Sequence, residues 1–237
     1  MVSRLLLILL CSFPLTSLIG QTASTICLNE VKAAYASIDH EKLLQAPGQS
    51  NLQYTREYAV RANPQEFFKS SESRTYSPGQ LNYKHYEGLT VTDEEEAFIL
   101  REGQYVIYRT GSQLKKEAPV VNGLDAGIFE HCTALNCKFT ADRSNKSAYL
   151  VVDAAGQKKY QISDLTIETN PLDSSLVRIQ VNYLAPHLYQ EADYHFEKIS
   201  MDPQAKEQMG KAASVFLKED GSLKDQFKGN KLMDYRR

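Results

Sequence analysis

The stretch Glu96-Ala-Phe-Ile-Leu-Arg-Glu-Gly-Gln-Tyr-Val-Ile-Tyr-Arg109 contains two short apolar runs on either side of Glu102-Gly103. A glycine at this place supplies the positive φ of a tight turn, so the pattern predicts a β-hairpin. Successive strand residues point to opposite faces, and in the first run both faces carry apolar side chains. A hairpin with one solvated face would alternate between apolar and polar residues. We therefore expect either a cover on both faces or an apolar groove along one of them.

The sequence before this hairpin has the period of two that is typical of β-strands. Apolar and polar residues alternate from Leu52 to Val60, and Arg56 interrupts the apolar row. Turn residues such as Ser77-Pro78-Gly79 separate this segment into short strands. Further strands are expected at 67–76, 81–86 and 89–92. The whole region predicts an antiparallel meander, which closes into a barrel or curls into an open half-barrel.

Residues 25–44 show the spacing of an amphipathic helix. Leu28, Val31, Tyr35 and Ile38 follow one another at intervals of three and four, which places them on one helical face. Pro47-Gly48 ends the helix. We expect this helix to cover one face of the meander, giving an α+β fold.

A second, short helix is expected at 124–135, because Leu124, Ile128, Phe129 and Cys132 recur at helical spacing. It would complete the cover of the half-barrel. Strand patterns return after it. These further strands are expected at 149–152, 160–167, 176–183 and 194–199.

The last part of the chain, residues 201–237, differs in pattern from the strands before it. A weak helix is expected at 204–213, and a small hairpin at 215–223 with Asp220-Gly221 as its turn. We expect residues 21–200 to form the half-barrel domain and the last part to be an extension packed on the same domain.

The first twenty residues are expected to be a signal peptide. Arg4 supplies a positive n-region, Leu5–Leu10 begins an apolar h-region, and Gly20 is a small residue before a cleavage site. No later stretch is long and apolar enough to span a bilayer, so an exported, soluble mature chain is expected. The net charge of −2 provides no basic excess, which argues against a nucleic-acid surface.

The chain has four cysteines, of which Cys11 lies inside the h-region. Export permits disulfides, and Cys132 and Cys137 are close in sequence, so we expect these two to pair. The alternative, a zinc site that includes His131, has too few ligands nearby, and no metal site is expected. Cys27 is interpreted as a small apolar residue on a buried helix face, with a reactive thiol as the alternative.

The order of these elements resembles the LolA/LolB-like superfamily of periplasmic lipoprotein carriers. The resemblance is carried by Ser73–Arg109 and Leu165–Tyr183, and above all by the run Phe98–Tyr108. This run has an aliphatic pair, then a turn with an acidic residue and glycine, and then aromatic and aliphatic residues that end in tyrosine. It implies an open half-barrel with a hydrophobic cavity, in the periplasm of a Gram-negative envelope. The sequence departs from the family at Ser77-Pro78-Gly79, where no arginine adjoins the proline, so the family's lid-holding arginine cannot be carried over. In the C-terminal tail, the turn Gly221-Ser-Leu-Lys224 and the basic end Asp234-Tyr-Arg-Arg237 resemble those of exported proteins of the Bacteroidetes.

An apolar set on the predicted sheet is the candidate ligand site. Where the sheet is wider than its two helices, the set would line a groove for an acyl chain; elsewhere it would be the core beneath them. The members of this set are Tyr54, Tyr58, Tyr83, Phe98, Leu100, Tyr105 and Ile107.

Other chemistry finds little support in the sequence. The acidic run Asp93–Glu96 is either a cation site or a solvated turn, and the five histidines show no metal spacing. No Gly-x-Ser-x-Gly elbow and no phosphate-binding glycine loop is present, so neither an enzyme nor a cofactor is expected. A catalytic triad need not be visible in sequence, and a hydrolase stays an alternative.

The sequence thus predicts a non-enzymatic periplasmic carrier or binding protein that holds a lipid acyl chain or a lipidated protein. The alternative is a component of an envelope protein complex with the same fold and a filled core, which would dock through residues 215–237.

Overall fold

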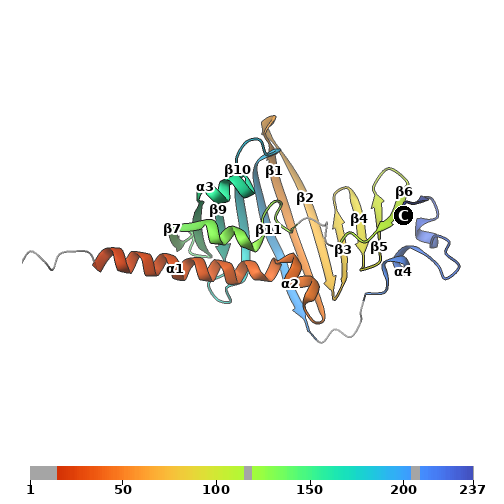
Figure 1. The fold of residues 1–237 in the computed structure, drawn as a ribbon, viewed down its shortest axis with the longest axis horizontal. Helices are drawn as coiled ribbons and strands as arrows, with labels where there is room; N and C mark the ends of the chain where they lie inside the picture. The colour runs from red at the N-terminus through yellow and green to blue at the C-terminus, as the bar shows by residue number, and fades with distance from the viewer. Residues whose placement is uncertain (1–14, 115–118, 204–208, 237) are drawn as a thin grey trace, which may run out of the picture.

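The computed structural model describes residues 15–114, 119–203 and 209–236 (Figure 1). Its strands are β1 (Gln49–Val60), β2 (Asn63–Ser77), β3 (Gln80–His85), β4 (Gly88–Thr92), β5 (Glu96–Arg101), β6 (Val106–Gly111), β7 (Cys132–Phe139), β8 (Lys146–Val152), β9 (Ile162–Thr169), β10 (Leu176–Tyr183), β11 (Tyr189–Asp202) and β12 (Lys231–Asp234). Its helices are α1 (Leu15–Tyr35), α2 (His40–Gln45), α3 (Ala154–Tyr160) and α4 (Ala212–Phe216), with short 3₁₀ turns η1 (Ala36–Ile38), η2 (Ala126–His131) and η3 (Asp225–Phe227).

The twelve strands of the described residues form one sheet, in the order β12-β6-β5-β4-β3-β2-β1-β11-β10-β9-β8-β7. Neighbouring strands are antiparallel except β12 and β6, which are parallel. The outermost strands, β7 and β12, lie at opposite ends of the molecule (Figure 1). The sheet is therefore open, and the predicted α+β half-barrel is confirmed.

The predicted hairpin is formed by β5 and β6, which pair from Glu96 with Gly111 to Arg101 with Val106. Gly103 has a φ of +79° in the turn, as the sequence required. Tyr105 also has a positive φ, 53°, which is uncommon for an aromatic residue and marks it as part of the turn instead of a strand.

The predicted N-terminal helix is present, but it is divided. α1 ends at Tyr35, and α2 starts anew after Asp39, whose side chain accepts a hydrogen bond from the Lys42 backbone N–H at 3.1 Å. Such a cap competes with continuation of the helix. Val31 and Ile38 of the predicted face are buried. We call the sheet face that α1 covers the inner face and the opposite face the outer face.

The short second helix was predicted too long. Residues 124–135 contain only the turn η2, and strand β7 begins directly after it at Cys132. Asp125 caps the turn by accepting from the Gly127 N–H at 2.8 Å. Ile128 and Phe129 are buried as the helical spacing suggested, because a 3₁₀ turn also brings residues three apart together.

The predicted Cys132–Cys137 disulfide is wrong. Cys137 is bonded to Cys27, and Cys132 is a free, buried thiol. Cys132 and Cys137 lie on the same extended strand, where five residues span roughly 16 Å, far beyond the reach of a disulfide. The bond that forms ties α1 to the edge strand β7, with Cα atoms 6.3 Å apart. Nearness in sequence misled the prediction.

The apolar side chains form two separate clusters on opposite faces of the sheet. The larger cluster lies on the inner face and includes Val31 of α1, Tyr54 of β1 and Leu165 of β9. The smaller cluster contains Phe98 and Ile107. The strand register places these on the outer face, because Phe98 pairs with Val91 and Val91 pairs with Asn82, whose neighbour Leu81 points inward.

The C-terminal segment covers this outer cluster. Phe216 of α4 is fully buried and stacks on Phe98, with ring centroids 5.2 Å apart. β12 then extends the sheet beside β6. A bridge between Leu217 and Leu223 confirms the predicted turn at Asp220-Gly221, but Val215 and Phe216, predicted in its first strand, belong to α4. Part of the predicted helix 204–213 lies outside the described residues, and α4 begins at its end.

Candidate functional site: an aromatic rim above a buried ion pair

The structure divides the predicted apolar set between the two faces. Tyr54, Tyr58 and Tyr83 belong to the inner face. Phe98, Leu100 and Ile107 belong to the outer cluster beneath α4, and Tyr105 is 72% exposed in the hairpin turn. The seven residues therefore do not line one surface, and the inner-face members mark the candidate site.

The candidate site follows the length of β1. Tyr54 lies opposite Glu72 of β2, Arg56 lies opposite Ser70, and Tyr58 lies opposite Phe68. These residues alternate along the strands, so all of them face inward. Exposure rises along this row: Tyr54 is buried, Tyr58 is half-buried and Phe68 is 40% exposed.

The open end of the row is a cluster of ring side chains, which we call the aromatic rim: Tyr58, Phe68, Tyr183, His187 and Tyr189. The Tyr58 ring stacks on Phe68 at 5.5 Å and meets Tyr189 edge-on at 4.9 Å between centroids. Tyr183 and His187 stack at 4.0 Å. The rings pack into one cluster, in which Tyr183 is buried and donates from its hydroxyl to the Asn122 carbonyl at 2.8 Å, whereas His187 and Tyr189 are half-buried.

The rim is assembled from two distant parts of the sequence, and Arg61 joins them. Its Nη2 donates to the backbone carbonyl of Tyr183 at 2.6 Å, and its Nε donates to that of His187 at 3.1 Å. The loop after β10 is thereby held against the end of β1. The rim is fixed by backbone contacts as well as by ring packing.

Beneath the rim lies a group that we call the ionic floor: Tyr54, Arg56, Glu72, Arg74 and Tyr83. Glu72 Oε2 accepts from the hydroxyl groups of Tyr54 at 2.9 Å and Tyr83 at 2.6 Å. Its Oε1 accepts from Arg56 Nη2 at 3.0 Å, and from the Ser70 hydroxyl at the same distance. A carboxylate has about four acceptor positions, so Glu72 is saturated.

The two guanidinium groups of the ionic floor also contact aromatic rings. Arg74 donates from Nε to the Tyr54 hydroxyl at 3.2 Å and lies 4.1 Å above the Tyr83 ring. Arg56 lies 5.0 Å from the Tyr58 ring, so it touches both the ionic floor and the rim. Such cation–π contacts stabilise guanidinium groups that have lost water.

Burial shifts the titration of several groups at the site. Burial raises the pKa of Tyr54 and of Tyr83, so both hydroxyls stay protonated as donors to Glu72. Burial also lowers the pKa of His85, whose ring centroid lies 4.8 Å from that of Tyr83, and the pKa of His187 in the rim. The histidines at this surface are therefore neutral at pH 7, and the rim carries no positive charge of its own.

Sequence reasoning noted Arg56 only as an interruption of an apolar row and gave no role to Glu72. A charged residue at an inward position of a strand is the signal for such a pair, since buried charges need partners. Tyr183, His187 and Tyr189 could not be joined to β1 by pattern, because their proximity depends on the strand order.

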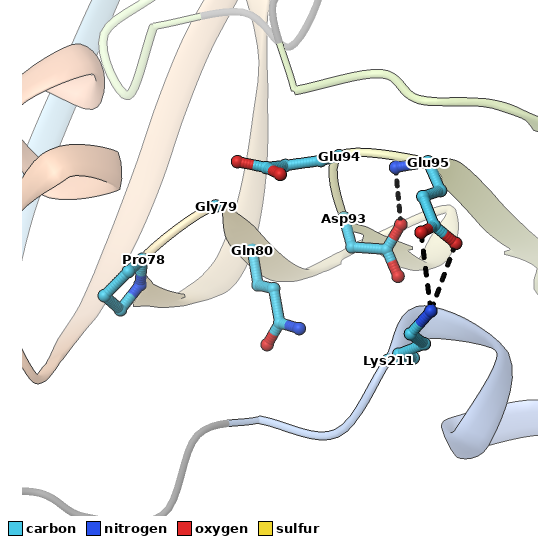
Figure 2. A pocket seen from close by; sticks show the side chains of 7 residues that line it. All are labelled: Pro78, Gly79, Gln80, Asp93, Glu94, Glu95 and Lys211. Carbon is cyan, nitrogen blue, oxygen red and sulfur yellow. Dashed lines mark hydrogen bonds and ion pairs between the residues drawn. The ribbon is translucent and has the colours of Figure 1, made fainter.

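A second site is a polar pocket of about 200 Å³ between the β2–β3 turn, the β4–β5 turn and the start of α4 (Figure 2). Its lining residues are Pro78, Gly79, Gln80, Asp93, Glu94, Glu95 and Lys211. Asp93 accepts from the backbone N–H groups of Glu95 and Glu96 at 2.9 Å and from that of Ala212 at 2.8 Å. Lys211 lies 3.3 Å from Glu95. This part of the acidic run thus fastens the tail to the β4–β5 turn.

The structure places no group of three or more His, Cys, Asp or Glu side chains at metal-binding distance among the residues it describes. In the same residues, no helix has the length and hydropathy needed to cross a membrane.

One cysteine, histidine and aspartate lie near one another, as a hydrolase would require. His131 Nδ1 is 3.2 Å from Asp153, and Cys132 follows His131 in the chain. Burial raises the pKa of the Cys132 thiol to about 11, the opposite of what an activated nucleophile needs. The arrangement is therefore unsuited to thiolate chemistry.

Comparison with known proteins finds no family model that matches the chain and no matching curated protein. Solved structures similar to it include an uncharacterized conserved protein from Thermus thermophilus, with 12% identity, a TM-score of 0.42 and coverage of 91% of this chain and 99% of that one. A LolA superfamily protein from Nitrosomonas europaea has 6% identity and a TM-score of 0.28, covering 71% and 93%. The Pseudomonas aeruginosa MucA/MucB complex has 9% identity and a TM-score of 0.35, covering 76% and 61%. These matches describe structural similarity alone, and the LolA-like resemblance stays an expectation from the sequence.

Proposed function

We propose that this protein is a non-enzymatic binding protein of the periplasm that holds the acyl chain of a lipid or of a lipidated protein against the aromatic rim. The observation that carries the proposal is the partial exposure of packed rings on the inner face, with Phe68 40% exposed and Tyr58 half-buried.

The positions of the helices support this proposal, because they leave the tip of the β1–β2 hairpin uncovered. α1 packs on β7, β8 and β9, and α2 packs on β2. α2 lies at the far end of β2, where the Gly79 N–H donates to the Leu44 carbonyl at 3.2 Å. Ser77 lies nine residues after Phe68, about 30 Å along the strand, so the rim lies well beyond α2. In Figure 1 the β1–β2 hairpin rises away from both helices.

The chemistry of the rim suits an apolar chain. Rings offer broad contact area, and the polar atoms of Tyr58 and Tyr189 allow the surface to stay in water when no ligand is bound. Burial of apolar surface would supply the affinity, at about 0.8 kcal/mol for each CH₂ group. No reacting group is needed for such a role.

A chain-length series tests this function. Purified full-length protein is titrated with a fluorescent fatty acid, which is then displaced by saturated fatty acids of increasing length. Each added CH₂ should tighten binding about fourfold until the chain outgrows the rim. Tyr58→Ala and Phe68→Ala should each weaken binding at least tenfold.

The matched control is Phe139→Ala. Phe139 is 51% exposed on β7, at the other end of the sheet, and its loss should leave uptake unchanged. Absence of binding for every chain length, or equal losses in the control, would sink the proposal.

A second candidate function, docking of an envelope protein, is favoured by the free edge of β12 and by Tyr235, which is 55% exposed beside it. A chain that ends at Asn230 keeps α4 on Phe98 but lacks β12. Loss of a defined partner with unchanged fatty-acid uptake in this variant would favour docking over lipid binding.

A further inference from the structure

We infer that Arg56 receives the head of the bound amphiphile and that this head is an anionic oxygen group, a carboxylate or a phosphate. This inference rests on the proposed function, because it assigns the polar end of a ligand whose chain lies on the aromatic rim.

Arg56 stands at the border between the covered and the open part of the inner face. Tyr194, its partner on β11, is fully buried, whereas Tyr58, two residues further along β1, is half-buried in the rim. A chain that lies along the rim therefore meets Arg56 at its inner end.

The charged groups of the ionic floor differ in exposure. The Arg56 side chain is 14% exposed, but the side chain of its partner Glu72 is 1% exposed. A ligand approaching from the rim therefore reaches the guanidinium and not the carboxylate. Glu72 is also saturated by four donors and has no acceptor position left for Arg56 Nε.

The Nε atom of Arg56 is buried and has no hydrogen-bond partner. A buried donor without an acceptor is destabilising, and for a charged group the effect is larger than for a neutral one. The guanidinium offers its N–H groups in a planar fork that matches the two oxygens of a carboxylate or phosphate. An anionic head at this point would contact the exposed part of the Arg56 side chain and lower the cost of the poorly satisfied guanidinium, while Nη2 stays bonded to Glu72.

The test compares ligands that share one chain and differ in the head. Wild-type protein is titrated with oleate, oleyl alcohol and 1-oleoyl lysophosphatidate in the same displacement assay. Oleate or lysophosphatidate should bind at least about tenfold more tightly than oleyl alcohol. Tighter binding of one anion shows whether the site prefers a carboxylate or a phosphate head. Similar affinities for both show that the site recognises the anionic oxygens that they share, and either result supports the inference.

Arg56→Gln should reduce the preference for the anionic ligands over oleyl alcohol to less than about threefold. Arg178→Gln is the matched control. Arg178 also pairs with carboxylates, Asp193 at 2.6 Å and Glu168 at 3.2 Å, but it lies on the outer face, so its loss should keep the preference intact.

The outcomes separate this inference from the proposed function. Equal wild-type affinities for oleate and oleyl alcohol, or a preference that survives in Arg56→Gln, would overturn the role of Arg56 and leave the rim as a chain-binding surface. Absence of binding for all three ligands would overturn both. Equal wild-type affinities would overturn the inference even if Arg56→Gln does not fold.

Discussion

The two ends of the sheet bury their apolar residues on opposite faces. From β7 to β11, the inner face is filled by Ile167, Ile179 and their neighbours beneath α1. From β4 to β6, the outer face is filled by Phe98 and Ile107 beneath α4. Between these ends, the long strands β1 and β2 carry Tyr58 and Phe68 of the aromatic rim, whereas α1 packs on β7, β8 and β9 and α4 packs on β4 and β5.

This difference explains why the β5–β6 hairpin is apolar on both faces. Its outer face is covered by the tail, and on its inner face Ala97 is buried while Ile99 is half-buried. Apolar residues on both faces of a strand therefore indicate the place where the cover of the sheet changes from one face to the other. Each cover should be separable by mutation, with effects confined to its own end.

The largest effect is expected from the disulfide that fastens α1. Cys27→Ala opens a loop of 110 residues, for which chain entropy predicts a loss of about 4–5 kcal/mol in the free energy of unfolding. Urea denaturation of the non-reduced protein measures it. Cys132→Ala keeps the disulfide and should reduce the free energy of unfolding by clearly less than Cys27→Ala does.

The disulfide assignment itself is checked by peptide mapping without reduction. A linked pair of peptides that contain Cys27 and Cys137 is expected. A peptide linked through Cys132 would contradict the assignment of Cys132 as the free thiol.

The next largest effect concerns the cover of the other end. Phe216→Ala removes a fully buried ring that stacks on Phe98 and should cost about 3–4 kcal/mol. Hydrogen exchange should quicken in residues 88–111 and stay unchanged in β7–β10. Equally faster hydrogen exchange across the whole sheet would show that the two ends unfold as one cooperative unit, and would contradict the separate roles of α1 and α4.

A smaller effect is expected from pH, and it belongs to the α2 end of the sheet. Burial lowers the pKa of His40, although its contact with the Leu114 carbonyl, 3.0 Å from Nε2, acts in the opposite direction. The unfolded chain then binds the proton more readily than the folded one, so stability should decrease as pH falls below about 6.5. His40→Gln should flatten this dependence in thermal melts from pH 7.5 to 5. An unchanged slope would assign it to other groups.

The smallest effect is expected at the turn of the central hairpin. Tyr105 is 72% exposed, so Tyr105→Ala should change the free energy of unfolding by less than about 0.5 kcal/mol. Phe98→Ala, seven residues earlier and fully buried, should cost about 3–5 kcal/mol. Similar losses from both changes would mean that the turn is packed in solution.

Local patterns predicted the elements well and the faces poorly. The spacing of Val31 and Ile38 identified the buried side of the helix, and the turn at Gly103 identified the hairpin, because both depend on neighbours in sequence. The pairing of Cys27 with Cys137 and the meeting of Tyr58 with Tyr189 depend on strand order, which period-two patterns do not encode. A one-residue change of register moves a strand's whole apolar set to the other face, so Phe98 and Tyr83 could not be separated from sequence.

The most direct test of the central claim is photo-crosslinking with a diazirine-bearing fatty acid, followed by peptide mapping of the labelled sites. The account predicts that label concentrates on residues 56–70 and 183–189, at the aromatic rim, and is lost when unlabelled oleate competes. Label concentrated on residues 88–111 or 209–236, or spread evenly over the chain, would contradict it.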